Sequence, residues 1–545
     1  MGWAPASLIR RLFSSEYGAS DRLIPRWLFL RAFGLIYFSA FYSLIFQIRG
    51  LIGPQGILPA SDYLEAVARS FGPYTRFWFA PTLLWFSTSS HMLMTLCWVG
   101  MAASLLLVLN LWPRAMLVIC FVCFLSFIGA AGEFSSYQSD GMLLEAGFIC
   151  LFFAPPGLRP GLGASHPPSR ASLFLLQWEW VRISFESGLV KLASGDPQWR
   201  HLTAMDEYYQ NGPLPTWIGW YAQHLPHWFH AGSAFATLAI ELVLVWMFFL
   251  PRRFRIIFFY IATFLQIGII LTANYTFLNY LVLFLGVLLL DDRFLVRYVP
   301  YSWRSFLNAG LAARQNTLEI SERDQPQEQH QRTWRTAIHR HFSALKLAVS
   351  AVMLTWIFYV TTAELLLILV RWLPLPTRPI VLLEPLRIAN QYGLFAVMTR
   401  GRYEIEFQGS NDGQNWTEYP FRYKPQDPSK PPGIYAPYQP RFDWNLWFAS
   451  LGSWREYSMV PNTEIRLLSN SPDVLALFAS NPFPNAPPRQ VRAVLWQYWF
   501  TTMTEKRATG MWWRRQLLGL YAPVLQREDD GRISVVQSPE IPPRE

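Results

Sequence analysis

The sequence predicts a polytopic α-helical membrane protein with a β-rich domain after its last membrane span, and three observations lead to this fold class. Of the 545 residues, 52% are hydrophobic and only 15% are charged, against roughly 25% charged residues in an average soluble domain. The 25 Trp residues suit the aromatic belts that form where a protein meets lipid headgroups. Long apolar segments recur up to residue 372, and alternating and Pro-rich patterns replace them from residue 374 onward.

About nine apolar segments, or eight if one short segment is discounted, are candidates for transmembrane helices, each of which needs roughly 20 residues to cross the hydrocarbon. They are residues 27–46, 92–109, 115–131, 142–155, 171–193, 231–250, 255–273, 277–290 and 345–372. The fourth and the eighth are short enough to be re-entrant or half-buried helices instead. Residues 1–12 lack the apolar core and cleavage site of a signal peptide, so we expect the first span to direct membrane insertion.

The distribution of arginine predicts the orientation of these spans. With nine crossings, the arginines of residues 10–26, the cluster at 252–255 and the loop 293–344 fall on one side, which the positive-inside rule makes cytoplasmic. The net charge of +10 then reflects topology, and we expect no nucleic-acid partner. Contact between the Arg-rich loop and anionic lipid headgroups is an alternative to a solvated loop, and its polar residues 325–331 are expected to be disordered.

These patterns divide the chain into five parts. Residues 1–292 are expected to form a helix bundle with two extracytoplasmic loops, 293–344 a cytoplasmic loop, 345–373 the last transmembrane helix, 374–525 an extracytoplasmic β-rich domain and 526–545 a disordered tail. Within the domain, residues 403–407 alternate as a half-buried strand does, 409–413 supply a turn, and 416–423 complete a hairpin. Residues 441–448 return to an apolar pattern, and 473–480 are typical of a short helix.

Charged residues inside or beside the spans mark the candidate site, because a charge in the bilayer is costly without a partner or a task. Lys191 stands out between two long apolar segments. Glu179, Arg182 and Glu186 share one helical face. The full set of intramembrane charges is Arg31, Glu145, Glu179, Arg182 and Glu241, with Arg31 as a candidate counter-ion. Two interpretations stay open: a polar seam that locks helices together, or a cavity that opens at the outer face with Lys191 at its mouth.

Absent motifs exclude several enzyme classes. The chain has no Gly-x-Ser-x-Gly elbow, no Gly-Lys dipeptide and no His-Glu-x-x-His motif, so it is neither an ordinary α/β-hydrolase lipase, nor a P-loop protein, nor a zincin. Cys120 and Cys123 have redox-pair spacing, but their place within a span favours simple packing. His224, His227 and His230 favour an interfacial loop over a metal site, and we predict no metal.

Ordered motifs along nearly the whole chain resemble the lipase maturation factor family. They include residues 50–59 (GLIGPQGILP), 140–148 (DGMLLEAGF), pieces of the block 188–230, 271–279 (LTANYTFLN), 409–416 (GSNDGQNW) and 436–444 (APYQPRFDW). The resemblance implies a chaperone-like membrane protein that helps secreted lipases, or other exported client proteins, to fold and assemble. It also implies a location in the endoplasmic reticulum membrane in animals or the cytoplasmic membrane in bacteria, with the C-terminal domain lumenal or periplasmic.

This resemblance implies a client lipase and membrane lipids as partners, and no cofactor. We expect contacts with a client or ligand at Asp196, Trp199, Arg200, Asp206, Tyr208, His227, Trp416, Asp443 and Trp444.

A fainter likeness leads to a second hypothesis. Residues 188–192 (GLVKL) are similar to a segment of vitamin K-dependent gamma-carboxylase in which a Lys-Lys-Leu run carries the base chemistry, although only one lysine is present here. On this comparison the chain would be an intramembrane enzyme with Lys191 as base and Glu186 or Asp196 as its partner, acting on a lipid-soluble molecule. Only this alternative would call for a bound lipid or quinone.

Overall fold

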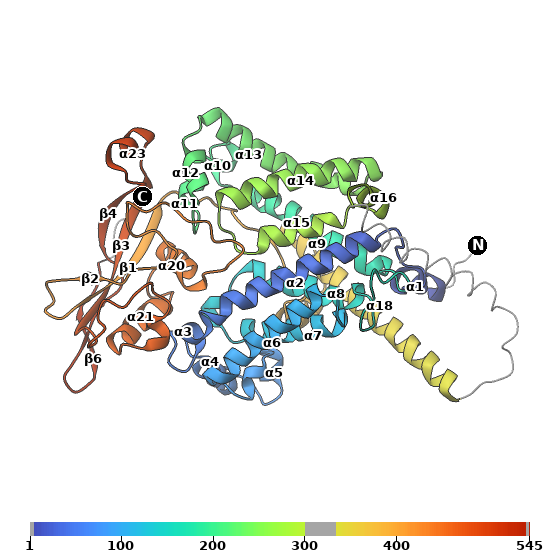
Figure 1. Ribbon diagram of the computed structural model, residues 1–545, viewed down its shortest axis with the longest axis horizontal. Helices are drawn as coiled ribbons and strands as arrows, with labels where there is room; N and C mark the ends of the chain where they lie inside the picture. Colours follow the sequence, from blue (N-terminus) through green and yellow to red (C-terminus); the bar gives the residue numbers. More distant parts are fainter. Residues whose placement is uncertain (1–4, 300–333, 541–543, 545) are drawn as a thin grey trace, which may run out of the picture.

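The computed structural model describes residues 5–299, 334–540 and 544, and it places a helix bundle beside a sheet domain (Figure 1). Each of the nine predicted apolar segments is helical in the described part of the chain. The corresponding helices are α2 (Leu23–Ile45), α6 (Ser90–Val108), α7 (Pro113–Ile128), α8 (Gln138–Phe153), α9 (Arg170–Ala193), α13 (His227–Leu242), α14 (Arg252–Thr272), α15 (Leu278–Val287) and α18 (Trp334–Leu369).

Shorter helices connect these nine. They are α1 (Pro5–Phe13), α3 (Ile48–Ile52), α4 (Ala60–Ser70), α5 (Thr75–Phe79), α10 (Pro197–Arg200), α11 (Tyr208–Asn211), α12 (Trp217–Gln223), α16 (Asp292–Leu295) and α19 (Arg378–Leu383).

Membrane insertion is supported by length and apolar composition. Within the described residues, five helical stretches are long and apolar enough to cross a bilayer, namely Leu23–Ile45, Ser90–Val108, His227–Phe249, Arg252–Thr272 and His341–Leu369. Helices α7 and α15 are apolar but shorter, and α9 is long but carries several charges. The chain is therefore an integral membrane protein, while the number of nine crossings stays a prediction.

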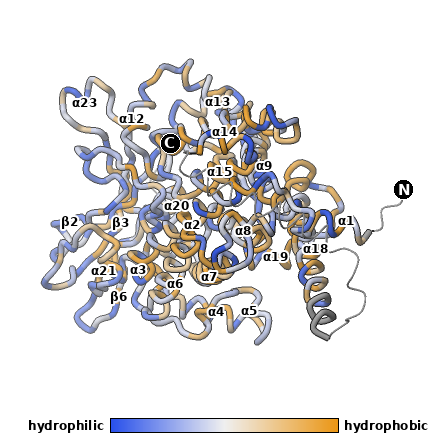
Figure 2. The backbone as a smooth tube through the Cα atoms, turned by 45° about the vertical axis from the view of Figure 1, so that its right-hand side comes forward, coloured by the Kyte–Doolittle hydropathy of each residue, from blue (hydrophilic) through white to orange (hydrophobic). Residues whose placement is uncertain are grey.

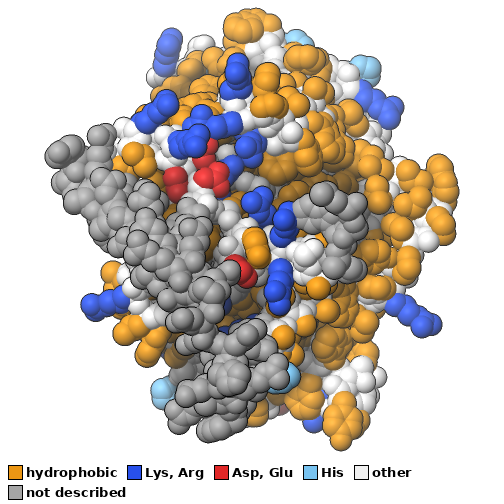
Figure 3. Space-filling model, turned by 90° about the vertical axis from the view of Figure 1, so that its right-hand side faces the viewer, with side chains coloured by type: hydrophobic (Ala, Val, Ile, Leu, Met, Phe, Trp, Pro, Cys, Tyr) orange, Lys and Arg blue, Asp and Glu red, His pale blue; other side chains and the backbone are white. Residues whose placement is uncertain are grey.

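Consecutive helices run back and forth between two ends of the bundle (Figure 1). At one end, the Arg22 side chain donates to Leu288 O at 3.1 Å. At the other end, Arg441 of the sheet domain pairs with Asp140 at the start of α8. Lys and Arg side chains gather on the end away from the sheet domain (Figure 3), and exposed arginines of its helices and loops are Arg10, Arg11, Arg159, Arg170, Arg252, Arg253, Arg293 and Arg297. Exposed arginines also occur in the segments predicted on the other side, such as Arg49, Arg69 and Arg200, so the orientation of the chain in the membrane stays a prediction.

The C-terminal domain is an antiparallel sheet covered by helices. Its strands are β1 (Arg402–Ser410), β2 (Thr417–Glu418), β3 (Gln490–Phe500), β4 (Trp513–Leu520), β5 (Val524–Arg527) and β6 (Ile533–Gln537). They follow the order β2-β1-β3-β5-β6, with β4 also paired to β3. Ile405 of β1 lies opposite Leu495 of β3. Its helices are α20 (Arg441–Leu451), α21 (Met459–Leu468), α22 (Pro472–Leu475) and α23 (Met503–Thr509).

A single set of buried apolar side chains joins the two parts of the molecule. Phe442 of α20 stacks on Phe407 of β1 with ring centroids 6.5 Å apart, and the same core continues through Leu143 of α8 and Tyr37 of α2. The sheet domain is more hydrophilic along its strands than the helices are (Figure 2). The sheet domain therefore packs directly against the helix bundle and shares its hydrophobic core.

In the C-terminal region three predictions need correction, and one apolar segment that had no predicted element is now assigned. The second hairpin strand shrinks from 416–423 to Thr417–Glu418, because Pro420 has no N–H for the ladder. The apolar segment 441–448 lies in helix α20, and the helix predicted at 473–480 is reduced to α22. The prediction that the tail is disordered is wrong for Ile533–Gln537, which form β6. Leu525 of β5 pairs with Val535 of this strand, and its β-branched residues favour a strand.

The last bundle helix also starts earlier than predicted. Helix α18 begins at Trp334 and not at residue 345, so the predicted loop 293–344 ends in helix. Most of that loop, including the polar residues 325–331, lies outside the described residues.

Candidate functional site

Lys191 forms a buried ion pair near the C-terminal end of α9. Its Nζ donates to Glu241 of α13, at 2.7 Å to Oε2 and 2.9 Å to Oε1, and to Ser187 Oγ at 2.6 Å. The ring of Trp199 lies 5.2 Å from the same nitrogen. An ammonium group has three donors, and these three oxygens account for all of them. The partner of Lys191 is therefore Glu241, and the prediction of Glu186 or Asp196 as its partner is wrong.

Glu186 and Asp196 instead hold the segment that leads into the sheet domain. Glu186 Oε2 accepts from Tyr392 N at 2.7 Å, and Asp196 Oδ2 accepts from Met398 N at 2.7 Å. Trp199 Nε1 donates to Phe395 O at 2.9 Å. The side chains of Asp196 and Trp199 are buried in these contacts, so they position the backbone of 392–398 and do not form an open client surface.

Buried charges of α8 and α9 contact one another, as in the polar seam that is one of the two interpretations left open by the sequence. Arg182 pairs with Glu145, and Glu186 Oε1 lies 3.9 Å from Arg182 Nη1. Asn390 joins the pair, because its N–H donates to Glu145 Oε2 at 2.9 Å and its carbonyl accepts from Arg182 at 2.8 Å. The Glu179 carboxylate is also buried, and neither of its oxygens finds a hydrogen-bond donor within the described part of the chain.

Arg31 does not belong to this seam, contrary to the prediction that it is a counter-ion. Its guanidinium donates to Leu107 O at 3.0 Å and to Asn110 Oδ1 at 3.0 Å. Both acceptors lie at the C-terminal end of α6, where main-chain carbonyls lack partners within the helix and a cation is favourable. Arg31 therefore caps α6.

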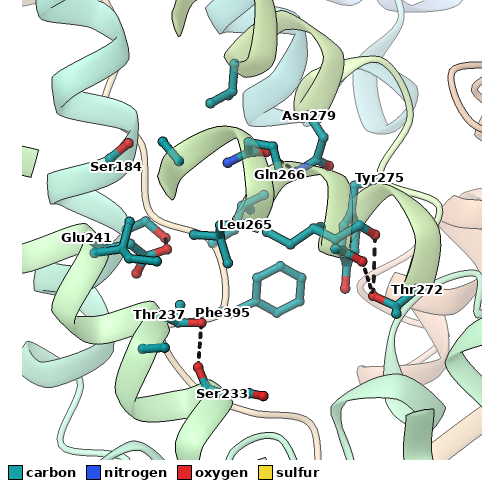
Figure 4. A pocket seen from close by; sticks show the side chains of 18 of the residues that line it. Ser184, Ser233, Thr237, Glu241, Leu265, Gln266, Thr272, Tyr275, Asn279 and Phe395 are labelled. Atoms are coloured by element: carbon teal, nitrogen blue, oxygen red, sulfur yellow. Dashed lines mark hydrogen bonds between the residues drawn. The ribbon is translucent and has the colours of Figure 1, made fainter. Parts of the chain in front are cut away.

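A cavity with a volume of about 380 Å³ lies beside the Lys191–Glu241 pair. Its walls come from α9, α13, α14 and α15, and residues 392–395 close one side, with Phe395 reaching into the space between Glu241 and Tyr275 (Figure 4). Tyr208, predicted as a client contact, is buried and lines this cavity. The volume falls within the roughly 300–1,000 Å³ of small-molecule pockets. The structure thus combines a buried ion pair, which joins α9 to α13, with a cavity beside it.

The remaining bundle candidates lie in the loop before α13. Arg200 is exposed, and His227 Nδ1 lies 3.0 Å from Asp206 Oδ1 in a solvent-accessible contact. The other two histidines point elsewhere: His224 contacts Trp220 O at 2.7 Å and Thr501 O at 3.0 Å, and His230 contacts Leu225 O at 2.8 Å. Across the described residues, no group of three or more His, Cys, Asp or Glu side chains could hold a metal ion.

The cysteines behave as packing residues. Cys120 and Cys123 are free thiols buried in α7, and Cys97 and Cys150 are buried in α6 and α8. All four side chains therefore pack in the apolar core, as the sequence predicts for cysteines within apolar segments.

The C-terminal candidates do not share one surface. Trp416 is half-buried with the Arg492 guanidinium 4.0 Å from its ring. Asp443 and Trp444 are buried, and Asp443 Oδ1 accepts from Tyr423 N at 3.2 Å and Lys424 N at 3.1 Å. Desolvation by burial raises the pKa of Asp443 to about 6, against the lowering effect of these two backbone N–H groups. Asp443 therefore shapes the Pro-rich loop and is not available to a client.

Sequence reasoning missed the residues that join the two parts of the molecule. Arg441 forms a bidentate pair with Asp140, at 2.7 and 2.8 Å, and also donates to Phe134 O. Asn274, after α14, accepts from Tyr435 N and donates to Gly433 O at 2.9 Å. Asp140, Asn274 and Arg441 all stand in the motifs quoted from the sequence, but nothing in the motifs shows that they face one another.

Two family models match the chain in the order of its two structural parts. The model described as the lipase maturation factor transmembrane domain matches residues 24–297. The model described as the lipase maturation factor C-terminal domain matches residues 388–523. The chain belongs to the lipase maturation factor family. The predicted resemblance is confirmed. The first match covers α2 to α16 of the helix bundle and the second covers β1 to β4 of the sheet domain, while α18 lies between the two matches.

Named relatives extend this match over most of the chain. Lipase maturation factor 2 of Mus musculus is 33% identical over 597 aligned residues, which cover 94% of this chain and 84% of the relative. Lipase maturation factor 2 of Homo sapiens is 33% identical over 603 residues, with the same coverage. Lipase maturation factor 1 of Bos taurus is 31% identical over 530 residues, which cover 93% of this chain and 90% of the relative. No solved structure matches this family member.

Proposed function

We propose that this protein is a membrane-embedded maturation factor that helps a secreted or exported lipase to reach its active, assembled state. The observation that carries the proposal is the match of both family domains, in order, to proteins named lipase maturation factors. The joined architecture fits this role, because Arg441 and Asn274 fix the sheet domain on the bundle. A fixed domain presents one constant surface to a folding client.

The contacts of Lys191 count against the gamma-carboxylase-like hypothesis. A lysine that removes a proton from a substrate needs a free amine facing that substrate. Here the oxygens of Glu241 and Ser187 receive all three donors of the Lys191 ammonium group. The pair joins α9 to α13, and its role is structural.

The sheet domain is proposed to face the lumen of the endoplasmic reticulum or the periplasm. Its support is the group of exposed arginines in α14 and α16, such as Arg253 and Arg293, because α16 lies at the end of the bundle away from the sheet domain (Figure 1). Positively charged loops stay in the cytoplasm during insertion. A domain on the other side meets lipases as they are exported.

We place client contact at a second cavity, on the sheet domain. This cavity has a volume of about 630 Å³ and lies between Leu214 and Pro215 of the bundle and residues 418–435 of the domain. Its lining includes charges of both signs, among them Glu418, Arg422 and Lys430. A partly folded polypeptide offers backbone polar groups and charged side chains together, and a mixed polar lining suits it better than an apolar pocket would.

The function is tested in cells from which their own lipase maturation factors have been removed. The chain is expressed with a secreted lipase from the same organism, and lipase activity per unit of lipase protein is measured in the medium. We expect this specific activity to rise when the chain is present, while a secreted phosphatase expressed as a control is unchanged. Equal lipase specific activity with and without the chain, at normal levels of the chain in the membrane, would overturn the proposal.

The client-contact cavity is tested with a matched pair of charge reversals. Arg422→Glu changes an exposed side chain of the cavity lining. Arg507→Glu changes an exposed arginine of α23 outside that lining. We expect Arg422→Glu to lower lipase activation roughly tenfold, as about 1.4 kcal/mol of lost binding does, and Arg507→Glu to leave it unchanged. Equal effects of the two variants would remove the cavity from the proposal.

A further inference from the structure

We propose that the cavity between α9, α13, α14 and α15 holds the acyl chain of a membrane lipid, which enters from the bilayer between α13 and α14. This inference does not rest on the proposed function, since it concerns what occupies the bundle and not which client the protein assists. Its grounds are the position of the cavity, the construction of its mouth and the chemistry of its lining.

The cavity lies directly behind the two most lipid-exposed helices of the bundle. Among the five described spans that could cross a membrane, those that contain α13 and α14 have the smallest shares of buried residues, 17% and 11%. Large apolar side chains cover their outer faces, such as Phe235, which is 64% exposed, and Phe264, which is 82% exposed. A membrane-spanning helix with such a surface faces lipid tails. The cavity is therefore separated from the bilayer by one layer of helix.

Small residues open this layer. Ala236 of α13 and Gly268 of α14 both line the cavity and are exposed on the outside of the bundle. A Cβ atom added at Gly268 would meet no atom within 4 Å. Phe264 lies one turn before Gly268 and also lines the cavity. The cavity thus reaches the lipid-facing surface at a gap that two small side chains leave between α13 and α14.

The lining favours hydrocarbon, because most of its polar groups already have hydrogen-bond partners within the protein; in the described residues the Tyr275 hydroxyl is an exception. Thr237 Oγ1 donates to Ser233 O at 2.9 Å and Thr272 Oγ1 donates to Gly268 O at 2.8 Å. Asn279 Nδ2 donates to Gln266 Oε1 at 2.8 Å. The charges of Lys191 and Glu241 neutralise each other.

The rest of the lining is apolar or aromatic, including Ile183, Ile240, Leu265 and Phe395. Such a surface offers water few hydrogen bonds and an empty space forfeits dispersion contacts. An acyl chain from the adjoining leaflet fills the cavity without a counter-charge and without breaking any of these hydrogen bonds.

The test uses a phosphatidylcholine with a diazirine in its acyl chain, incorporated into vesicles with the full-length protein. After illumination, labelled peptides are mapped by mass spectrometry. We expect label on inward-facing residues such as Ile183 of α9, which is 4% exposed, besides label on the outer faces of α13 and α14. A wild-type protein labelled only on its outer faces overturns the inference, as does a prenyl lipid that co-purifies in place of acyl lipids.

Two leucine substitutions separate the mouth of the cavity from the helix surface in general. Gly268→Leu closes the gap, and because a Cβ there meets nothing within 4 Å the variant should fold. Gly232→Leu on α13 is the matched control, since Gly232 is also an exposed helical glycine with open space around it but does not line the cavity. We expect Gly268→Leu to lower labelling of Ile183 about tenfold and Gly232→Leu to leave it unchanged. Equal labelling in the two variants overturns the proposed entry route, and lipase activation in either variant has no part in the readout.

Discussion

Lys191 Nζ lies 2.7 Å from Glu241 Oε2, and this pair, together with Ser187, ties the C-terminal end of α9 to the C-terminal end of α13. Both side chains are almost fully withdrawn from solvent. Removing one member of a buried pair leaves the other charge uncompensated, which costs about 3–5 kcal/mol, whereas replacing both can be nearly neutral. The pair can therefore be assigned to structure or to catalysis by a stability measurement.

We expect Lys191→Met to lower the free energy of unfolding by about 3 kcal/mol, and the double variant Lys191→Met/Glu241→Leu to recover most of that loss. Thermal unfolding in detergent, monitored by tryptophan fluorescence, measures the stability of the wild type, both single variants and the double variant, which together form a double-mutant cycle. A catalytic base would show a different result: Lys191→Met as stable as the wild type, with maturation of the client abolished.

A second prediction concerns the junction of the two domains. Arg441→Ala should leave the buried Asp140 carboxylate without its bidentate partner, which costs about 3–5 kcal/mol, and should loosen the sheet domain from α8. Limited proteolysis should then cut within residues 387–401, the connection between the domains. Arg455→Ala, at an exposed position of the same domain, is the control and should be cleaved at the wild-type rate.

A third prediction follows from the pKa of Asp443, which burial raises to about 6. In the unfolded chain this carboxyl has a pKa near 3.9, so the folded state binds the proton more tightly. The contribution of Asp443 to stability is then full below about pH 4 and is lost as the pH rises through about 6, a decrease of about 3 kcal/mol.

Asp443→Asn keeps an Oδ1 that can accept from the N–H groups of Tyr423 and Lys424, but it has no proton to lose. The thermal stability of this variant should exceed that of the wild type at pH 7.5 and match it more closely at pH 4.5. Thermal unfolding curves of the two proteins are recorded across this pH range. The same pH dependence of stability in both proteins would contradict the raised pKa of Asp443.

A fourth prediction concerns orientation in the membrane. All four native cysteines are buried, so alanine can replace them and single reporter cysteines can be added at exposed Ser429 or Arg253. A membrane-impermeant maleimide applied to sealed vesicles should label one of the two positions and reach the other only after permeabilisation. Labelling of both positions from the same side contradicts an odd number of membrane crossings between Arg253 and the sheet domain.

The sequence was sufficient to predict the elements that depend on local patterns. All nine apolar segments are helices in the described residues, and the predicted hairpin is present as β1 and β2, although β2 is shorter than predicted. The family was also recognisable, because its motifs are contiguous in the chain. The charges of the seam were found for the same reason: Glu179, Arg182 and Glu186 recur at helical spacing on a single helix.

Pairings between distant segments could not be predicted in this way. Glu241 lies 50 positions from Lys191, and nothing in either segment shows that α9 and α13 are neighbours. Arg31 was assigned to the seam by its charge alone, although it meets the end of α6. The strand β6 was hidden by the polar and Pro-rich residues around Ile533–Gln537, and its pairing with β5 is again a contact that only the folded chain reveals.

The pairing of Asp140 with Arg441 has a consequence for biosynthesis. The ribosome makes Asp140 301 residues before Arg441, so α8 is synthesised long before the cation that neutralises its carboxylate. Premature stop codons anywhere ahead of codon 441 should therefore yield unstable fragments that quality-control proteases clear, and not shortened anchors that persist. Pulse-chase half-lives of nested truncations should be short for every fragment that ends before residue 441.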